Sequence, residues 1–82
     1  MRVVIFDIKF PDKVLEFLQK ELPRHFQVSD FEVVQWRGLS GVSFRVLPDD
    51  IDWVVCVLTN VFEGTGVSLD IPSMPGFTVT IG

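Results

Sequence analysis

The order in which strand-like and helix-like apolar patterns follow one another is the feature that most limits how this chain can fold. Stretches rich in β-branched and aromatic residues, most with apolar residues at alternate positions, predict strands. Two other stretches repeat their apolar residues every three or four positions, which predicts helices. The predicted strands cover residues 2–8, 30–37, 42–47, 67–71 and 77–81, and the predicted helices begin at Pro11 and Asp49.

Local signals mark the ends of both predicted helices. Pro11 is well placed in a first helical turn, and Pro23 ends or kinks the same helix. Asp49 is predicted to cap the second helix, with Asp52 three residues later in the capping-box position. Gly64 is the predicted C-cap of that helix.

Turn signals join two pairs of predicted strands directly. Gly38 and Gly41 bracket a short turn, and a cluster of proline and glycine over residues 72–76 marks another. The resulting element order is βαββαβ followed by one more strand. This order predicts a single α+β domain over residues 1–82. We expect a ferredoxin-like sheet with an extra C-terminal strand in a hairpin and both helices on one face.

Residues that could carry chemistry are few. Cys56 is the only cysteine and His25 the only histidine, so neither an internal disulfide nor a tetrahedral zinc site can form. Capping explains the acidic cluster that includes Asp49 and Asp52, and the helical wheel places Cys56 on the polar side of the second helix. We therefore expect no catalytic residue, no cofactor and no metal. A domain of 82 residues buries a small core, so assembly is the expected source of additional stability.

Charge and hydropathy restrict the classes of partner. The net charge is −4 without any basic run, which argues against nucleic acid because binding it requires Lys and Arg at the phosphates. The longest apolar run, residues 53–58, is far too short to cross a membrane. The first residues do not resemble a signal peptide, and a lone cysteine suits a reducing compartment. We therefore expect a cytoplasmic protein.

The second predicted helix carries more apolar surface than one sheet can cover. Its apolar residues span an arc of roughly 200° on a helical wheel. Trp53 and Val55 lie at the two flanks of this arc. We expect these flanks to contact something other than the sheet.

The first predicted strand is apolar on both of its faces. Val4, Phe6 and Ile8 occupy one face and are expected to pack against the helices. Val3 and Ile5 occupy the other face, which two helices on one side of a sheet cannot cover. This predicts an open apolar sheet face.

The open face is expected to gain apolar side chains from the second strand, either Val34 with Trp36 or Phe31 with Val33. A contiguous exposed apolar patch usually marks an interface. The predicted interface residues are Val3, Ile5, Val34, Trp36, Trp53 and Val55.

In topology, with Asp7 closing the first strand and Pro11 opening the helix, the chain resembles small regulatory domains of the ACT type. The longer spacing and Asp12 after the proline depart from that motif, so no membership follows. The leading hypothesis is a small acidic, non-enzymatic module that self-associates as a homodimer or larger assembly. One alternative is an inhibitor or immunity-type protein that covers a basic surface of a target. Another, implied by the resemblance, is a regulatory domain that binds a small ligand between subunits.

Overall fold

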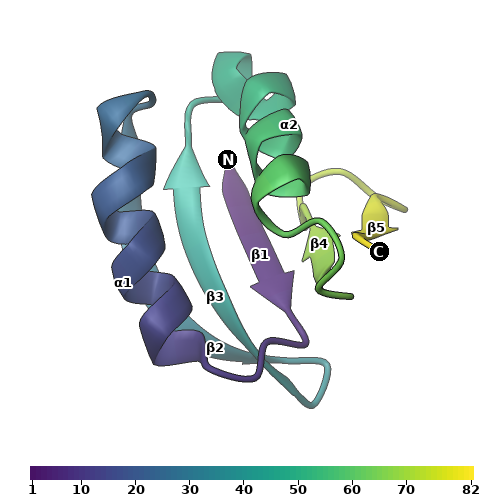
Figure 1. Ribbon diagram of the computed structural model, residues 1–82. Helices are drawn as coiled ribbons and strands as arrows, with labels where there is room; N and C mark the ends of the chain where they lie inside the picture. The colour runs from purple at the N-terminus through teal and green to yellow at the C-terminus, as the bar shows by residue number, and fades with distance from the viewer.

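The computed structural model describes all 82 residues as an α+β fold with a five-stranded antiparallel sheet and two helices (Figure 1). This confirms the predicted class. The strands run across the sheet in the order β2-β3-β1-β4-β5, so β4 pairs with β1 and β5 extends the sheet beyond β4. The elements are β1 (Arg2–Phe6), α1 (Pro11–Glu21), β2 (Val28–Trp36), β3 (Leu39–Val46), α2 (Ile51–Val61), β4 (Ser68–Asp70) and β5 (Thr78–Thr80).

β1 ends two residues earlier than the predicted strand because of the conformation of Asp7. This residue has a φ of 67°, in the left-handed region, and an extended strand cannot continue through it. Ile8 then joins the same buried cluster as Val3 and Ile5. Simple alternation wrongly places Ile8 with Val4 and Phe6, since it assumes an unbroken strand.

The β2–β3 hairpin turns at Arg37 and Gly38. Both residues have positive φ, 52° and 79°, as a two-residue type I′ turn requires. The prediction that Gly41 bounds the turn is wrong, because Gly41 lies within β3 opposite Phe6. A Cβ atom at Gly41 would lie 2.4 Å from the carbonyl oxygen of Ile5, which explains why this strand position holds a glycine.

The start of α1 agrees with the prediction, whereas α2 differs at both ends and has Phe62 rather than Gly64 as its C-cap. Pro11 begins α1 as expected, and Pro23 lies in a short 3-10 turn that follows it. The predicted capping of α2 is wrong, since no side chain caps it and a 3-10 turn over Pro48–Asp50 precedes it. That turn already bonds the amide of Asp50 to the carbonyl of Leu47, so the acidic side chains are not needed there.

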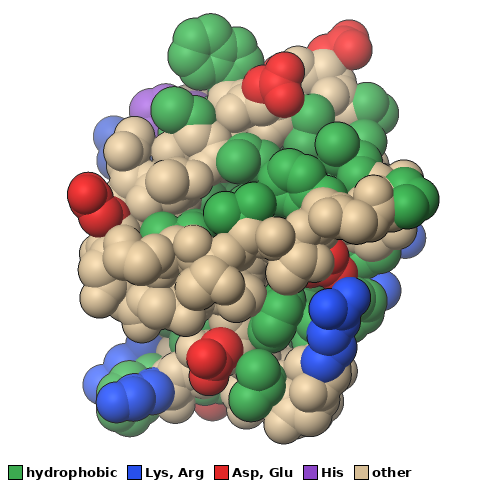
Figure 2. All heavy atoms as spheres, turned by 90° about the vertical axis from the view of Figure 1, so that its right-hand side faces the viewer, with side chains coloured by type: hydrophobic (Ala, Val, Ile, Leu, Met, Phe, Trp, Pro, Cys, Tyr) green, Lys and Arg blue, Asp and Glu red, His purple; other side chains and the backbone are tan.

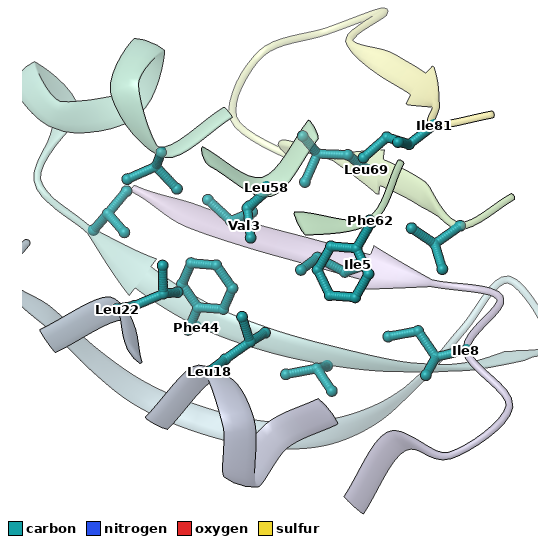
Figure 3. Packing of buried hydrophobic residues seen from close by; sticks show 14 residues of the cluster. Val3, Ile5, Ile8, Leu18, Leu22, Phe44, Leu58, Phe62, Leu69 and Ile81 are labelled. Carbon is teal, nitrogen blue, oxygen red and sulfur yellow. The ribbon is translucent and has the colours of Figure 1, made fainter. Parts of the chain in front are cut away.

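One hydrophobic cluster of 14 buried residues joins the sheet to both helices (Figure 3). Phe44 of β3 is fully buried beside Leu18 and Leu22 of the α1 side, and α2 contributes Val54 and Leu58. We call the sheet face that carries this cluster the core face, and the opposite one the outer face. The surfaces described below are located by reference to these two faces.

Candidate interaction surface

The expectation that Val3 and Ile5 are exposed is wrong. Both are 0% exposed and belong to the central cluster. The register explains the error, because Val3 lies opposite Phe44 and Ile5 opposite Val42 on β3. The apolar residues of β3 therefore lie opposite Val3 and Ile5, and not opposite Val4 and Phe6.

Val4 and Phe6, the alternate residues of β1, point to the outer face and are buried there by side chains rather than by helices. Val4 lies opposite Ser43 and Phe6 opposite Gly41, yet they are only 0% and 6% exposed. Trp36 on β2 lines a groove of about 450 Å³ together with Asp70 on β4. Because β3 and β1 lie between β2 and β4, the indole must extend across the sheet above these positions.

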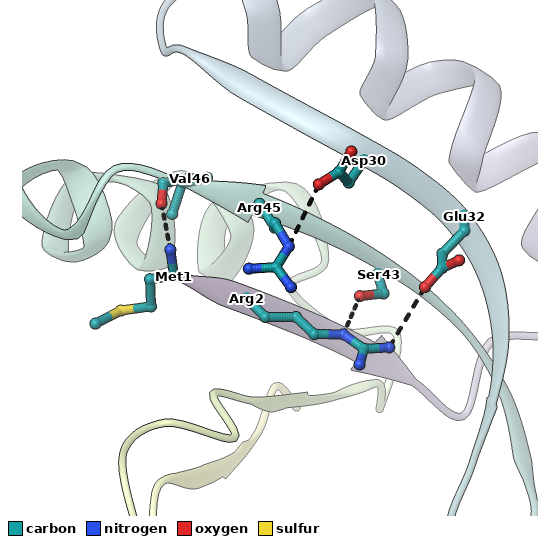
Figure 4. Close-up of polar contacts among 7 residues, drawn as sticks. All are labelled: Met1, Arg2, Asp30, Glu32, Ser43, Arg45 and Val46. Carbon is teal, nitrogen blue, oxygen red and sulfur yellow. Dashed lines mark hydrogen bonds and ion pairs between the residues drawn. The ribbon is translucent and has the colours of Figure 1, made fainter.

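Much of the rest of the outer face is charged (Figure 4). Arg2 donates a hydrogen bond from Nε to Ser43 Oγ at 2.7 Å and forms an ion pair with Glu32 at 3.5 Å. Arg45 pairs with Asp30 at 3.3 Å. The predicted open apolar face is therefore a largely polar surface.

Val34 and Trp36 are half-buried on this face rather than freely exposed. The guanidinium of Arg2 lies 5.6 Å from the Trp36 ring centroid, within range of a cation–π contact. These contacts give Trp36 a packing role within the domain.

Trp36→Ala should therefore destabilise the isolated domain. Removing a half-buried indole uncovers apolar surface on β1, which should lower the free energy of unfolding by about 2 kcal/mol. Urea denaturation measures the change, with Leu39→Ala at the nearby hairpin as the control. A loss no larger than that of the control would show that Trp36 does not cover the sheet.

Asp70 connects β4 to two other parts of the outer face. Its carboxylate side chain is 7% exposed, accepts a hydrogen bond from Thr78 Oγ1 at 3.0 Å, and lies 3.9 Å from Arg37 Nη2. Buried carboxylates need such partners. The contacts tie β5 and the hairpin turn to β4, so Asp70 has a structural explanation.

The second helix exposes one apolar flank. Trp53 is 68% exposed and Val61 is 41% exposed, while Val57 between them is half-buried. Their spacing of four residues places them on one side of α2. Val55, the other predicted flank residue, is half-buried against the core cluster, as are Val57 and Val14.

The first helix exposes a similar flank. Phe10 and Phe17 are 65% and 46% exposed, and Val14 lies between them at helical spacing. Phe10 and Val14 line a groove of about 370 Å³ with Phe62, which follows α2. This flank of α1 therefore faces α2.

The two flanks face each other across the space between the helices. The backbones of α1 and α2 stay apart, and α2 runs downward in Figure 1 with the sheet behind it. Val54 and Leu58 of α2 face the sheet. In a right-handed helix that runs in this direction, Trp53 and Val57, each one position earlier, lie on the side towards α1. We call the surface formed by the two flanks the interhelical surface. It comprises Phe10, Val14, Phe17, Trp53, Val57 and Val61.

Trp53, Phe10 and Phe17 are exposed on this surface, and of these only Trp53 was a predicted interface residue. Phe17, which is 46% exposed, was not among the predicted interface residues. Cys56 is exposed as the wheel predicts. No group of three or more His, Cys, Asp or Glu side chains is placed to hold a metal ion. No helix has the length and apolar character needed to cross a membrane.

Comparison with known proteins finds no family model, no curated protein and no solved structure that matches this chain. The functional argument therefore depends on the surfaces described above.

Proposed function

We propose that this protein is a small acidic, non-enzymatic interaction module that associates with copies of itself. The interhelical surface is the observation that carries the proposal. Its largest side chains, Trp53 and Phe10, remain 68% and 65% exposed after the domain has folded. Phe10 lies at the end of the helix pair that carries Phe62, whereas Trp53 lies in the first turn of α2 at the other end. Exposed apolar patches usually mark interfaces. The interface is thus assigned to the helix side rather than to the outer face of the sheet.

We further infer that the sheet is ferredoxin-like, with both helices on the core face and β5 as an addition. Support comes from the antiparallel order β2-β3-β1-β4 and from the single cluster that both helices share. This topology accommodates many unrelated functions. It therefore positions the interhelical surface without specifying what binds there.

A second copy is the occupant that the chemistry favours. The domain is small, and burial of a few hundred Å² of apolar surface would add several kcal/mol at about 25 cal/mol per Å². All members of the interhelical surface are uncharged, and Lys13 Nζ lies 5.5 Å from the Phe10 ring centroid. A cation at this position can reduce the repulsion between two copies that each carry a net charge of −4. Because Phe10 and Trp53 lie at opposite ends of the surface, a two-fold axis can bring Trp53 of one copy onto the α1 flank of the other.

One alternative function has its own structural support. The groove of about 370 Å³ beside Phe10 also contains Ile8, Val67 and Lys9. Asp7 lines the same groove, so its lining offers an apolar wall with one acidic and one basic side chain, which suits a small ligand with an apolar body and a polar end. Binding of that kind would correspond to the regulatory-domain hypothesis.

Sedimentation equilibrium at low and high salt tests the proposal. Apolar self-association should keep its dissociation constant within about threefold between 0.05 and 0.5 M NaCl, because screening acts mainly on exposed charges. Capture of a basic target, as an inhibitor or immunity-type protein would require, should weaken steeply over the same range. Salt-sensitive association would contradict the apolar interface.

A further inference from the structure

The two edges of the sheet differ in how they are protected against pairing with another strand. β2 carries Asp30 and Glu32, and its register with β3 is irregular between Ser29 and Glu32. Asp30 also has a φ of 56°, which interrupts the extended edge. Charges and irregularities of this kind block edge-to-edge association.

β5 has none of these protective features. All three of its residues, Thr78, Val79 and Thr80, are exposed. The segment from residue 77 to residue 82 contains no charged residue and no proline. An uncharged edge strand can template another strand, and the three-residue length of β5 limits the contact to a short ladder.

The backbone of β5 leaves a defined set of groups unpaired. The amide of Ile81 donates to the carbonyl of Val67 at 2.8 Å, so Ile81 directs its amide towards the β4 side. Ladder bonds alternate along an antiparallel strand, which places the amide and carbonyl of Val79 on the same side. The corresponding groups of Thr78 and Thr80 therefore point away from the sheet.

We propose that β5 pairs antiparallel with β5 of a second copy, about a two-fold axis at Val79, so that one sheet continues through both copies. The inference rests on the proposed self-association and adds a second contact to it. The strand reads Thr-Val-Thr in both directions, so Thr78 lies opposite Thr80 of the other copy. Threonine pairs of this kind are favourable cross-strand neighbours.

Val79 gives this contact an apolar component. It lies opposite Leu69 of the core cluster and so projects on the core face, where it remains 42% exposed. Figure 2 shows hydrophobic side chains gathered in the middle of the side of the molecule that carries β5. Pairing about the two-fold axis would bring the two Val79 side chains together and shield them from water.

Proline at position 80 tests the pairing. Thr80→Pro removes an outward amide but none of the inward bonds to β4, whereas the control Thr80→Val keeps the amide and the branched side chain. Both are made in a Trp53→Asp background, which isolates the strand contact. We expect the Thr80→Val protein to have about twice the 9.3 kDa mass of one chain and the Thr80→Pro protein to be monomeric.

Val79→Lys in the same background provides a second test that leaves the backbone unchanged. It should weaken association at least 100-fold by placing two ammonium groups at the axis, with far-UV circular dichroism confirming the fold. A dimer that survives Thr80→Pro or Val79→Lys, or Trp53→Asp protein that is already monomeric, would overturn the pairing. If Trp53→Asp leaves assembly unchanged while Thr80→Pro alone abolishes it, the helix-side proposal fails and the strand pairing stands.

Discussion

Trp53→Asp should abolish the contact between the helix layers of two copies. Each copy contributes one Trp53 to a two-fold interface, so the substitution removes two anchors from every dimer. Truncation of an interfacial tryptophan commonly costs about 2–4 kcal/mol, and loss of two should weaken association at least about 10³-fold. Dilution of fluorescently labelled protein in the Thr80→Pro background measures this contact alone.

Trp53→Asp should act on association without destabilising the folded domain. Because Trp53 is 68% exposed, Trp53→Asp should leave the free energy of unfolding almost unchanged, and a carboxylate suits the first turn of α2. Trp53→Lys should dissociate the copies as well, since the contact is apolar rather than ionic. Asp52→Asn, which changes a neighbouring exposed residue, should leave association intact. Equal association constants for wild type and Trp53→Asp would contradict the helix-side interface.

Gly41→Ala should be the most damaging small substitution in the sheet. The added methyl group would lie 2.4 Å from the Ile5 carbonyl oxygen and 3.0 Å from the Phe6 Cα atom. Both neighbours belong to the backbone of β1 and cannot move without distorting its pairing. Overpacking of this kind should cost about 3 kcal/mol, a large part of the stability of a small domain.

Gly38→Ala is the matched control for Gly41→Ala. Gly38 has a φ of 79° and no atom within 4 Å of an added Cβ, so the control tests backbone strain without crowding. We expect it to cost about 1 kcal/mol. Thermal and urea denaturation should place Gly41→Ala well below Gly38→Ala in stability. The reverse order would show that β1 and β3 are not as close as described.

The element order and the end of α1 could be predicted because each depends on local pattern. Alternation, helical spacing and Pro11 act within a few residues, and the structure has the expected strands and helices. The capping of α2 could not be predicted in the same way. The turn that begins at Pro48 supplies its own backbone bonds, which removes the need for Asp49.

The side of β1 that faces the helices was not readable from β1 itself. Both Val3 with Ile5 and Val4 with Phe6 are apolar, and the choice depends on which residues of β3 align with them. That register is a tertiary property, although the small residues Gly41 and Ser43 were a usable signal. In β3 the apolar residues Val42 and Phe44 alternate with small or polar ones. Once Phe44 is paired with Val3, the core face of the sheet is identified.

Exposure on the helix side was predictable only where it follows from a single helix. The helical wheel alone places Trp53 at the edge of the apolar arc of α2, independently of how the other elements pack. Trp53 is 68% exposed. Exposure of Phe17 depends on the distance between α1 and α2, which no local pattern encodes. The β5 edge depends on strand order, since β5 would be protected if it were an inner strand.

Self-association is tested most directly by the mass of the unmodified protein in solution. Light scattering at low micromolar concentration should give at least twice the 9.3 kDa of one chain, with the same result at high salt. A mass of 9.3 kDa across the micromolar range would contradict the account, because the interhelical surface and the β5 edge would then both remain in water.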